Sequence, residues 1–126
     1  METVKKGVLR EKSYKFALRV VNLYKYLSAE KREYVLSKQV LRSGTSIGAN
    51  VAKAQQGQSK ADFVHKLSIS LKESHETKYW LELLCDSEYI SREQTESLLN
   101  DCKELQKLLT ASIKTAKNNI KGLTLA

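Results

Sequence analysis

The residues best suited to chemistry are the carboxylates and histidines between positions 62 and 76. Asp62 and His65 are three residues apart and share one face of a helix. A di-iron centre in a helical bundle needs two Glu-x-x-His motifs and two further glutamates. Neither Glu73 nor Glu76 has a histidine three residues later, so the ligand count falls short. We therefore predict no metal site and no cofactor.

A second motif with possible chemistry is Gly44-Thr-Ser-Ile-Gly48, which matches the nucleophile-elbow pattern G-x-S-x-G. The elbow requires a turn between a strand and a helix, and here the motif lies inside a helical segment with no strand nearby. No Lys-Ser or Lys-Thr pair follows, so the motif is not a phosphate loop either. These mismatches predict that the protein is not an enzyme.

Glu73 and Glu76 stand in an apolar stripe of the third helical segment, between Ile69 and Trp80. A buried carboxylate must be paired or hydrogen-bonded. Candidate partners are the following cationic and amide side chains: Arg42, Lys66, Lys72, Gln39 and Asn50. Two interpretations stay open, a polar network that fixes helix register or a subunit interface, and an acid–base pair. No nucleophile is close in sequence, which favours the network.

The two cysteines show no metal-ligand spacing. Cys85 follows Leu84, and Cys102 stands among leucines of another helical segment. We expect both to be small core residues and not a disulfide. Residues 1–20 contain no apolar run long enough for a signal peptide or a membrane span, which predicts a cytoplasmic protein without a membrane partner.

Four helical segments account for almost the whole chain, which has no proline and five glycines. They run from about residue 11 to 27, from near 32 to 56, from about 60 to 87, and from residue 91 onward. Ser59 with Asp62 and Ser91 with Gln94 mark the starts of the last two. We predict an all-α, up-down antiparallel four-helix bundle over residues 11–126, preceded by a flexible basic arm at residues 1–10.

The second helical segment is unusual because half of its inward stripe is small or polar. Gly44 and Gly48 each cost about 1 kcal/mol relative to alanine inside a helix. We therefore expect another helix, from this chain or from a second protomer, to lie close against them. Together with the two stripes of the third segment, this predicts self-association through the second and third helices.

Positive charge is spread unevenly along the sequence. The net charge is +8, and residues 1–60 hold 13 Lys/Arg against 4 Asp/Glu, whereas residues 61–126 hold 9 against 10. Such asymmetry indicates a basic surface that could meet a polyanion, although a soluble bundle with two basic helices would look the same. Our candidate phosphate-binding residues are Lys12, Lys15, Arg19, Lys114, Lys117 and Lys121.

The centre of the chain carries a family resemblance. The run Leu41-Arg-Ser-Gly-Thr-Ser-Ile-Gly-Ala-Asn-Val-Ala-Lys-Ala-Gln55, with Ser59–Leu67 and Lys72–Leu81, resembles the bacterial four-helix-bundle family of 23S rRNA intervening-sequence proteins. The accessory variability determinant of diversity-generating retroelements is a related protein. The resemblance covers about residues 12–116. It departs from the family pattern at Lys53, where the family usually has a glutamate.

The resemblance implies a homopentamer, built as a ring or barrel of bundles. It also supports a structural role for five polar residues: Gln39, Ser46, Asn50, Lys72 and Glu76. From the helix stripes and the candidate pairings we expect the same structural or interface role for Arg42, Gly44, Gly48, Glu73 and Trp80. Two hypotheses about function follow. One is an oligomer that binds the backbone of RNA or DNA without sequence specificity. The other is a structural adaptor that binds a partner protein such as a reverse transcriptase.

Overall fold

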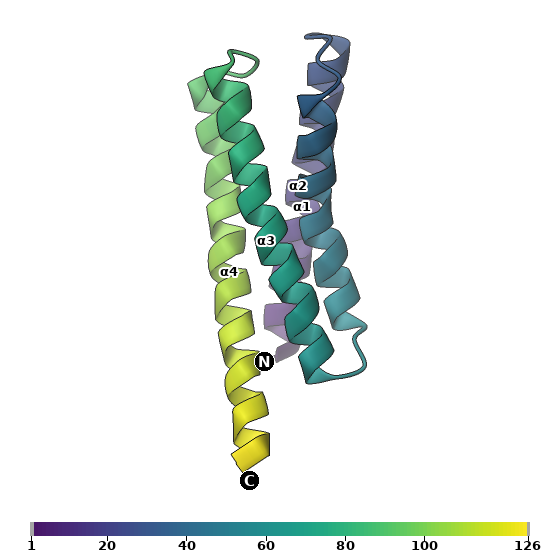
Figure 1. Ribbon diagram of the computed structural model, residues 1–126, viewed down its shortest axis with the longest axis vertical. Coiled ribbons are helices and arrows are strands. Elements are labelled where there is room, and N and C mark those ends of the chain that lie inside the picture. Colours follow the sequence, from purple (N-terminus) through teal and green to yellow (C-terminus); the bar gives the residue numbers. More distant parts are fainter. Residues whose placement is uncertain (1, 126) are drawn as a thin grey trace.

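The computed structural model describes the backbone of residues 2–125 and the side chains of residues 7–122. It contains four helices: α1 (Glu2–Ala29), α2 (Leu36–Gln55), α3 (Lys60–Asp86) and α4 (Arg92–Leu125). The described residues form no strand. The helices alternate in direction, so both termini lie at the same end (Figure 1). The all-α class and the four predicted helices are confirmed.

The first helix starts earlier than the sequence pattern predicts. We expected a flexible arm at residues 1–10, but α1 begins at Glu2. Leu9 is 4% exposed and extends the inward stripe of Phe16 and Val20 by two turns. Gly7 lies within α1 and does not interrupt it. Met1 lies outside the described residues.

The second helix starts later than predicted, at Leu36, because Glu33 forms a local cap. The Glu33 carboxylate accepts hydrogen bonds from the backbone N–H of Ser37 (2.6 Å) and Val35 (3.2 Å). Burial raises the pKa of this carboxyl, but the backbone hydrogen bonds outweigh burial and leave the pKa below its usual value. Glu33 is thus ionised and satisfies two of the free N–H groups around the start of α2.

The caps predicted for the last two helices are confirmed. Ser59 Oγ accepts from the backbone N–H of Asp62 at 3.0 Å. Ser91 Oγ accepts from the N–H of Gln94, and the Gln94 side chain accepts from the N–H of Ser91, both at 3.0 Å. This reciprocal pair is a capping box.

Gly44 and Gly48 face α1 of the same chain. A Cβ at Gly44 would lie 2.8 Å from both Cγ atoms of Val20, and one at Gly48 would lie 3.2 Å from the carbonyl oxygen of Ser13. The expectation of a closely packed helix is confirmed. The helix packed against them is α1 of the same chain, which is one of the two alternatives that the sequence left open.

The other side of α2 closes on α3 through small polar residues. Thr77 Oγ1 donates to Ser43 Oγ at 3.0 Å, and Ser70 Oγ donates to the carbonyl oxygen of Ile47 at 2.8 Å. These three hydroxyl-bearing side chains are fully buried. Because these side chains are small, α2 and α3 can approach closely. Each hydroxyl group has a hydrogen-bond partner on the other helix, so the close approach leaves none of the three unsatisfied.

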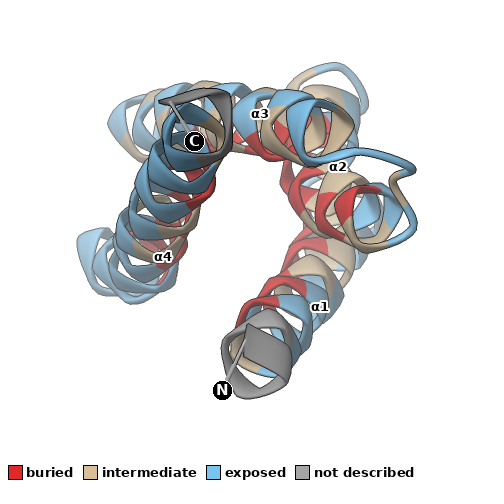
Figure 2. Ribbon diagram, turned by 90° about the horizontal axis from the view of Figure 1, so that it is seen from below, coloured by how far each residue is buried: buried red, intermediate tan, exposed pale blue. Residues whose placement is uncertain are grey.

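The helices pack in sequence order and leave one side of the bundle open. α1 packs on α2, α2 on α3 and α3 on α4, whereas α1 and α4 make few contacts. Seen along the bundle, α1 and α4 form two arms on either side of the α2–α3 pair (Figure 2). Buried residues on α1, α2 and α4 face the space between the arms (Figure 2).

We expect Gly44→Ala to destabilise the protein despite the better helix propensity of alanine. Val20 is fully buried and cannot move aside. Overpacking of this kind costs about 1–3 kcal/mol, which outweighs a propensity gain of about 1 kcal/mol. Urea unfolding measures the change. Gly122→Ala is the matched control, since its Cβ would meet nothing within 4 Å. Equal or greater stability of Gly44→Ala would contradict the proposed helix contact.

Candidate nucleic-acid interface

Five lysines follow one side of α4. They are Lys103, Lys107, Lys114, Lys117 and Lys121, and all five are exposed. Steps of four, seven, three and four residues keep them on one face of a helix. We call this set the α4 lysine stripe. Its backbone spans about 27 Å at a rise of 1.5 Å per residue. None of the five forms an ion pair with another described side chain.

The C-terminal part of the stripe lies next to α3. Lys114, Lys117 and Lys121 line a shallow hollow that Leu71 of α3 also borders. After Glu104 the sequence contains no acidic residue to its end. This part of α4 therefore presents positive charge that no neighbour on its own helix neutralises.

The basic face of α1 has a different environment. Lys12 Nζ lies 2.7 Å from Glu104 Oε1, and Arg19 Nη1 lies 2.6 Å from Asp101 Oδ2. Arg19 also donates to the hydroxyl of Ser97 at 2.9 Å. A hydrogen bond to Glu104 and its charge raise the pKa of Lys12. These contacts hold α1 beside α4, so Lys12 and Arg19 are already paired within the chain.

Lys15 is paired as well, with Glu11 one turn earlier on α1. The distance between Lys15 Nζ and Glu11 Oε1 is 2.9 Å. The hydrogen bond from Lys15 and its charge lower the pKa of Glu11. The six residues predicted to contact phosphate therefore do not form one surface: three pair within the chain near the α1–α4 seam, and three lie exposed beside α3.

Folding also separates charge along the length of the bundle. We divide the bundle across its middle, at the level of the Lys12–Glu104 and Arg42–Glu73 ion pairs. The half that contains the termini, the terminal half, then holds residues 7–15, 46–73 and 105–122, and the other half, the loop half, holds residues 16–45 and 74–104. Among the described side chains, the terminal half has 11 Lys/Arg and 3 Asp/Glu, whereas the loop half has 9 and 10. The net charges are +8 and −1. The basic excess of residues 7–60 is divided equally between the two halves of the fold, with a net charge of +4 in each. The difference between the halves comes from residues 74–104, with a net charge of −5, and residues 105–122, with a net charge of +4.

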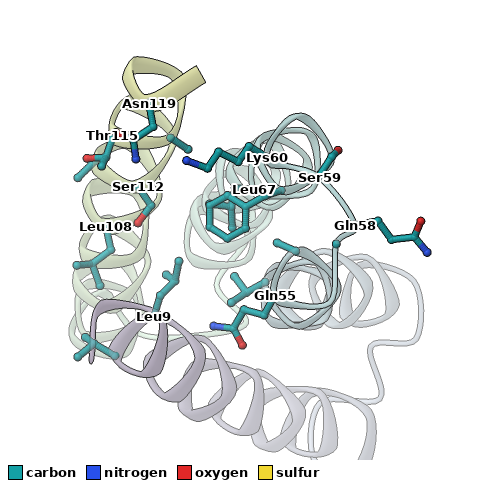
Figure 3. A pocket seen from close by; sticks show the side chains of 17 residues that line it. Leu9, Gln55, Gln58, Ser59, Lys60, Leu67, Leu108, Ser112, Thr115 and Asn119 are labelled. Carbon is teal, nitrogen blue, oxygen red and sulfur yellow. The ribbon is translucent and has the colours of Figure 1, made fainter. Parts of the chain in front are cut away.

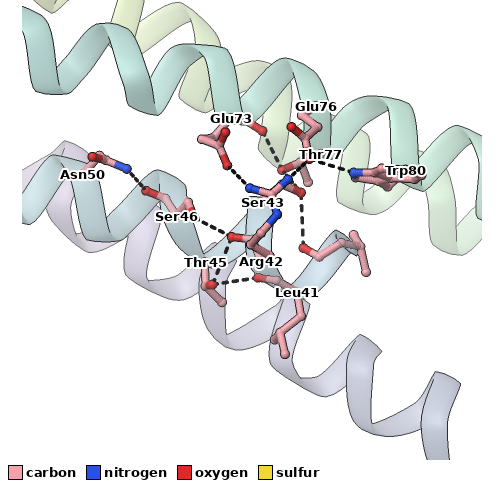
Figure 4. Close-up of polar contacts among 11 residues, drawn as sticks. Leu41, Arg42, Ser43, Thr45, Ser46, Asn50, Glu73, Glu76, Thr77 and Trp80 are labelled. Atoms are coloured by element: carbon pink, nitrogen blue, oxygen red, sulfur yellow. Dashed lines mark hydrogen bonds and ion pairs between the residues drawn. The ribbon is translucent and has the colours of Figure 1, made fainter. Parts of the chain in front are cut away.

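A polar cluster joins the outer faces of α2 and α3 (Figure 4). Arg42 Nη1 lies 2.9 Å from Glu73 Oε2, and its other terminal nitrogen pairs with Glu76. Trp80 Nε1 donates to Glu76 Oε2 at 3.0 Å. Both carboxylates share one guanidinium, which suits a structural cross-link. Arg42 is confirmed as a partner.

The other predicted partners of the cluster lie elsewhere. Asn50 donates to the carbonyl oxygen of Ser46 at 2.9 Å, and Ser46 Oγ donates to that of Arg42 at 2.6 Å. Gln39 is half-buried and Lys72 is exposed, and neither bonds to Glu73 or Glu76. The hydroxyl of Ser46 is thus turned back onto its own helix, and the G-x-S-x-G motif lies wholly inside α2.

The remaining chemically interesting groups also have structural surroundings. Burial raises the pKa of the Cys102 thiol to about 11, and its Sγ donates to the carbonyl oxygen of Ser74. Cys85 and Cys102 are free thiols.

Within residues 7–122 no group of three or more His, Cys, Asp or Glu side chains is placed to hold a metal ion. No helix in the described part of the chain is long and apolar enough to cross a membrane.

Comparisons with known proteins agree with the sequence resemblance. The family model described as 23S rRNA-intervening sequence protein matches residues 5–111. A crystal structure of a protein with unknown function, from the S23 ribosomal protein family of Bacteroides thetaiotaomicron, is 60% identical, with a TM-score of 0.86. The match covers 87% of this chain and 98% of that one. No curated protein sequence matches significantly. The relation to the accessory variability determinant stays a prediction.

We expect Arg42→Ala to destabilise the protein by about 1–3 kcal/mol, because it strips a charged carboxylate of its partner. The Glu73 side chain is only 12% exposed. Chemical denaturation measures the loss. Lys38→Ala, at an exposed position one turn earlier on α2, is the control. Adding Glu73→Gln to Arg42→Ala should recover part of the loss, and full stability of Arg42→Ala alone would rule out the cross-link.

Proposed function

Because the chain belongs to the 23S rRNA-intervening sequence protein family, we propose that it is a non-enzymatic, basic helical protein that binds the phosphate backbone of RNA or DNA. The family description supplies no activity. The α4 lysine stripe is the observation that carries the proposal. Contacts of lysine with phosphate give affinity without base specificity, so binding should follow charge and shape and not sequence.

The arrangement of charge supports α4 as the contact element. The terminal half carries the whole net positive charge, and four of the five stripe lysines lie in it. A field concentrated at one end orients a polyanion and speeds its encounter with that end. The contact set we propose is the α4 lysine stripe; Lys12, Lys15 and Arg19 are left out because each is paired within the chain.

We further propose that the protein self-associates through the outer face of α2 and α3. On α3 this face holds Ile69, Leu83 and Trp80, all only half-buried in the single chain. Tyr79 beside them is 59% exposed and packs edge-on against Trp80. Aromatic residues are typical of interface cores. A ring of five copies, as the resemblance implies, would repeat the α4 lysine stripe and add weak contacts through multivalency.

The alternative function is a structural adaptor for a partner protein, such as a reverse transcriptase. Exposed aromatic side chains away from α4 favour it, since Tyr14 is 65% exposed and Tyr34 is 55% exposed. A protein interface built on such residues depends on apolar burial and changes little with salt. Phosphate binding weakens steeply as salt is added, so the two functions differ in a measurable way.

We expect affinity for RNA or duplex DNA to fall linearly on a log–log plot against salt. Five contacts predict a slope of about −3.5 for single strands and about −4.5 for duplex DNA. The triple variant Lys114→Ala/Lys117→Ala/Lys121→Ala should reduce the slope by about 2 to 3. Fluorescence anisotropy measures both quantities.

The control removes three exposed lysines from the loop half: Lys25→Ala/Lys31→Ala/Lys38→Ala. It changes the net charge equally and should leave the slope unchanged. An equal loss in both triple variants would mean that only total charge matters and would reject α4 as the contact element. No binding at low salt would favour the adaptor function.

We expect Tyr79→Glu to reduce the mass of the assembly in light scattering, because a charge would be buried at the proposed α2–α3 contact. Tyr14→Glu, on the exposed face of α1, is the control and should keep the mass of the unmodified protein. Circular dichroism verifies that both variants retain their helices. An unchanged mass for Tyr79→Glu would place the contact elsewhere.

A further inference from the structure

The open side of the bundle contains a cavity at its terminal end. Its volume is about 570 Å³. All four helices contribute to its wall, among them Leu9 of α1, Val51 of α2, Leu67 of α3 and Leu108 of α4. Phe63 and Ala116 add further apolar surface. The cavity exists because α1 and α4 diverge toward their terminal ends and make few contacts (Figure 2).

Polar groups gather at the mouth of this cavity. Figure 3 shows Lys60 reaching from α3 toward Asn119 of α4, while Ser112 lies deeper on the α4 wall. Lys60 is exposed and forms no ion pair with another described side chain. Asp62, two residues later, turns toward Gly57 at the end of α2. A cationic group thus stands over an apolar space.

We infer that this cavity binds a small amphiphilic anion, a molecule with an apolar tail and one carboxylate. The tail would lie against the leucines and Phe63, and the carboxylate would pair with the amine of Lys60. Sites for small ligands between helices have volumes of about 300–1,000 Å³, apolar walls and a few polar groups that fix orientation. The cavity has each of these properties.

Charge argues against a second copy of the chain as the occupant. A second copy of the chain would bring its own terminal half, which is also at +8, against the mouth. Like charges at that distance repel, whereas an anion is attracted. The inference does not depend on nucleic-acid binding.

The experiment is calorimetric titration of the full chain with dodecanoate below its micellar concentration. We expect one molecule bound per chain. Dodecyltrimethylammonium, with the same tail and a positive head, should bind at least about tenfold more weakly. Acetate, with the head but no tail, should show no binding, because the apolar contact supplies most of the affinity.

Two pairs of variants locate the site. Lys60→Glu should weaken dodecanoate binding at least about tenfold, whereas Lys53→Glu makes the same charge change at an exposed position outside the cavity. Ser112→Phe should abolish binding by filling the space, whereas Asn100→Phe adds a ring to an exposed part of α4 that does not line the cavity. Circular dichroism verifies that all four variants are folded. If Ser112→Phe is unfolded, Lys60→Arg replaces it as the test: this variant keeps the positive charge and should retain dodecanoate binding.

Several outcomes would overturn the inference. They are absence of dodecanoate binding, equal binding of the cationic detergent, binding of many molecules per chain, and equal losses in Lys60→Glu and Lys53→Glu. Loss of assembly mass in Ser112→Phe with dodecanoate binding intact would also overturn it and would identify the cavity as a subunit contact. Loss of RNA binding in the α4 lysine variants has no bearing on it, so the two proposals fail separately.

Discussion

The close approach of α1 and α2 at Gly44 and Gly48 sets the geometry on which the other contacts depend. With no side chains there, the backbone of α2 lies directly against Val20 and Ser13 of α1. The opposite side of α2 carries small hydroxyl residues, which let α3 approach as closely and still satisfy their hydrogen bonds. Three helices are thus tightly packed, and α4 attaches to them chiefly through α3.

The α1 and α4 helices make few contacts with each other, and this explains both the cavity and the surroundings of Lys12 and Arg19 on α1. Across this seam, Lys12 and Arg19 reach acidic residues of α4 near the middle of the bundle. Solvent screens such exposed ion pairs, so they are too weak to draw the helices together along their whole length. Beyond the pairs, toward the termini, α1 and α4 separate and the apolar cavity remains.

Antiparallel packing also decides where charge accumulates. The start of α1 and the end of α4 lie far apart in the sequence but share the terminal half of the bundle, where most of the unneutralised lysines gather. The acidic residues of α4 precede residue 105 and lie in the loop half. The result is a molecule with one basic end, beside an apolar space whose mouth is cationic.

The helices and one close helix contact can be predicted from the sequence alone. Periodic apolar residues, two capping patterns and the absence of proline specify four helices, and Gly44 with Gly48 predicts a closely packed neighbour, because these signals act within a few residues. Which helix that neighbour is depends on how the whole chain packs. The tertiary structure also determines that Lys12 pairs with Glu104, 92 residues away, and that Leu9 is buried, which lengthens α1. Burial and Coulomb attraction depend on distance in space, which the order of residues does not contain.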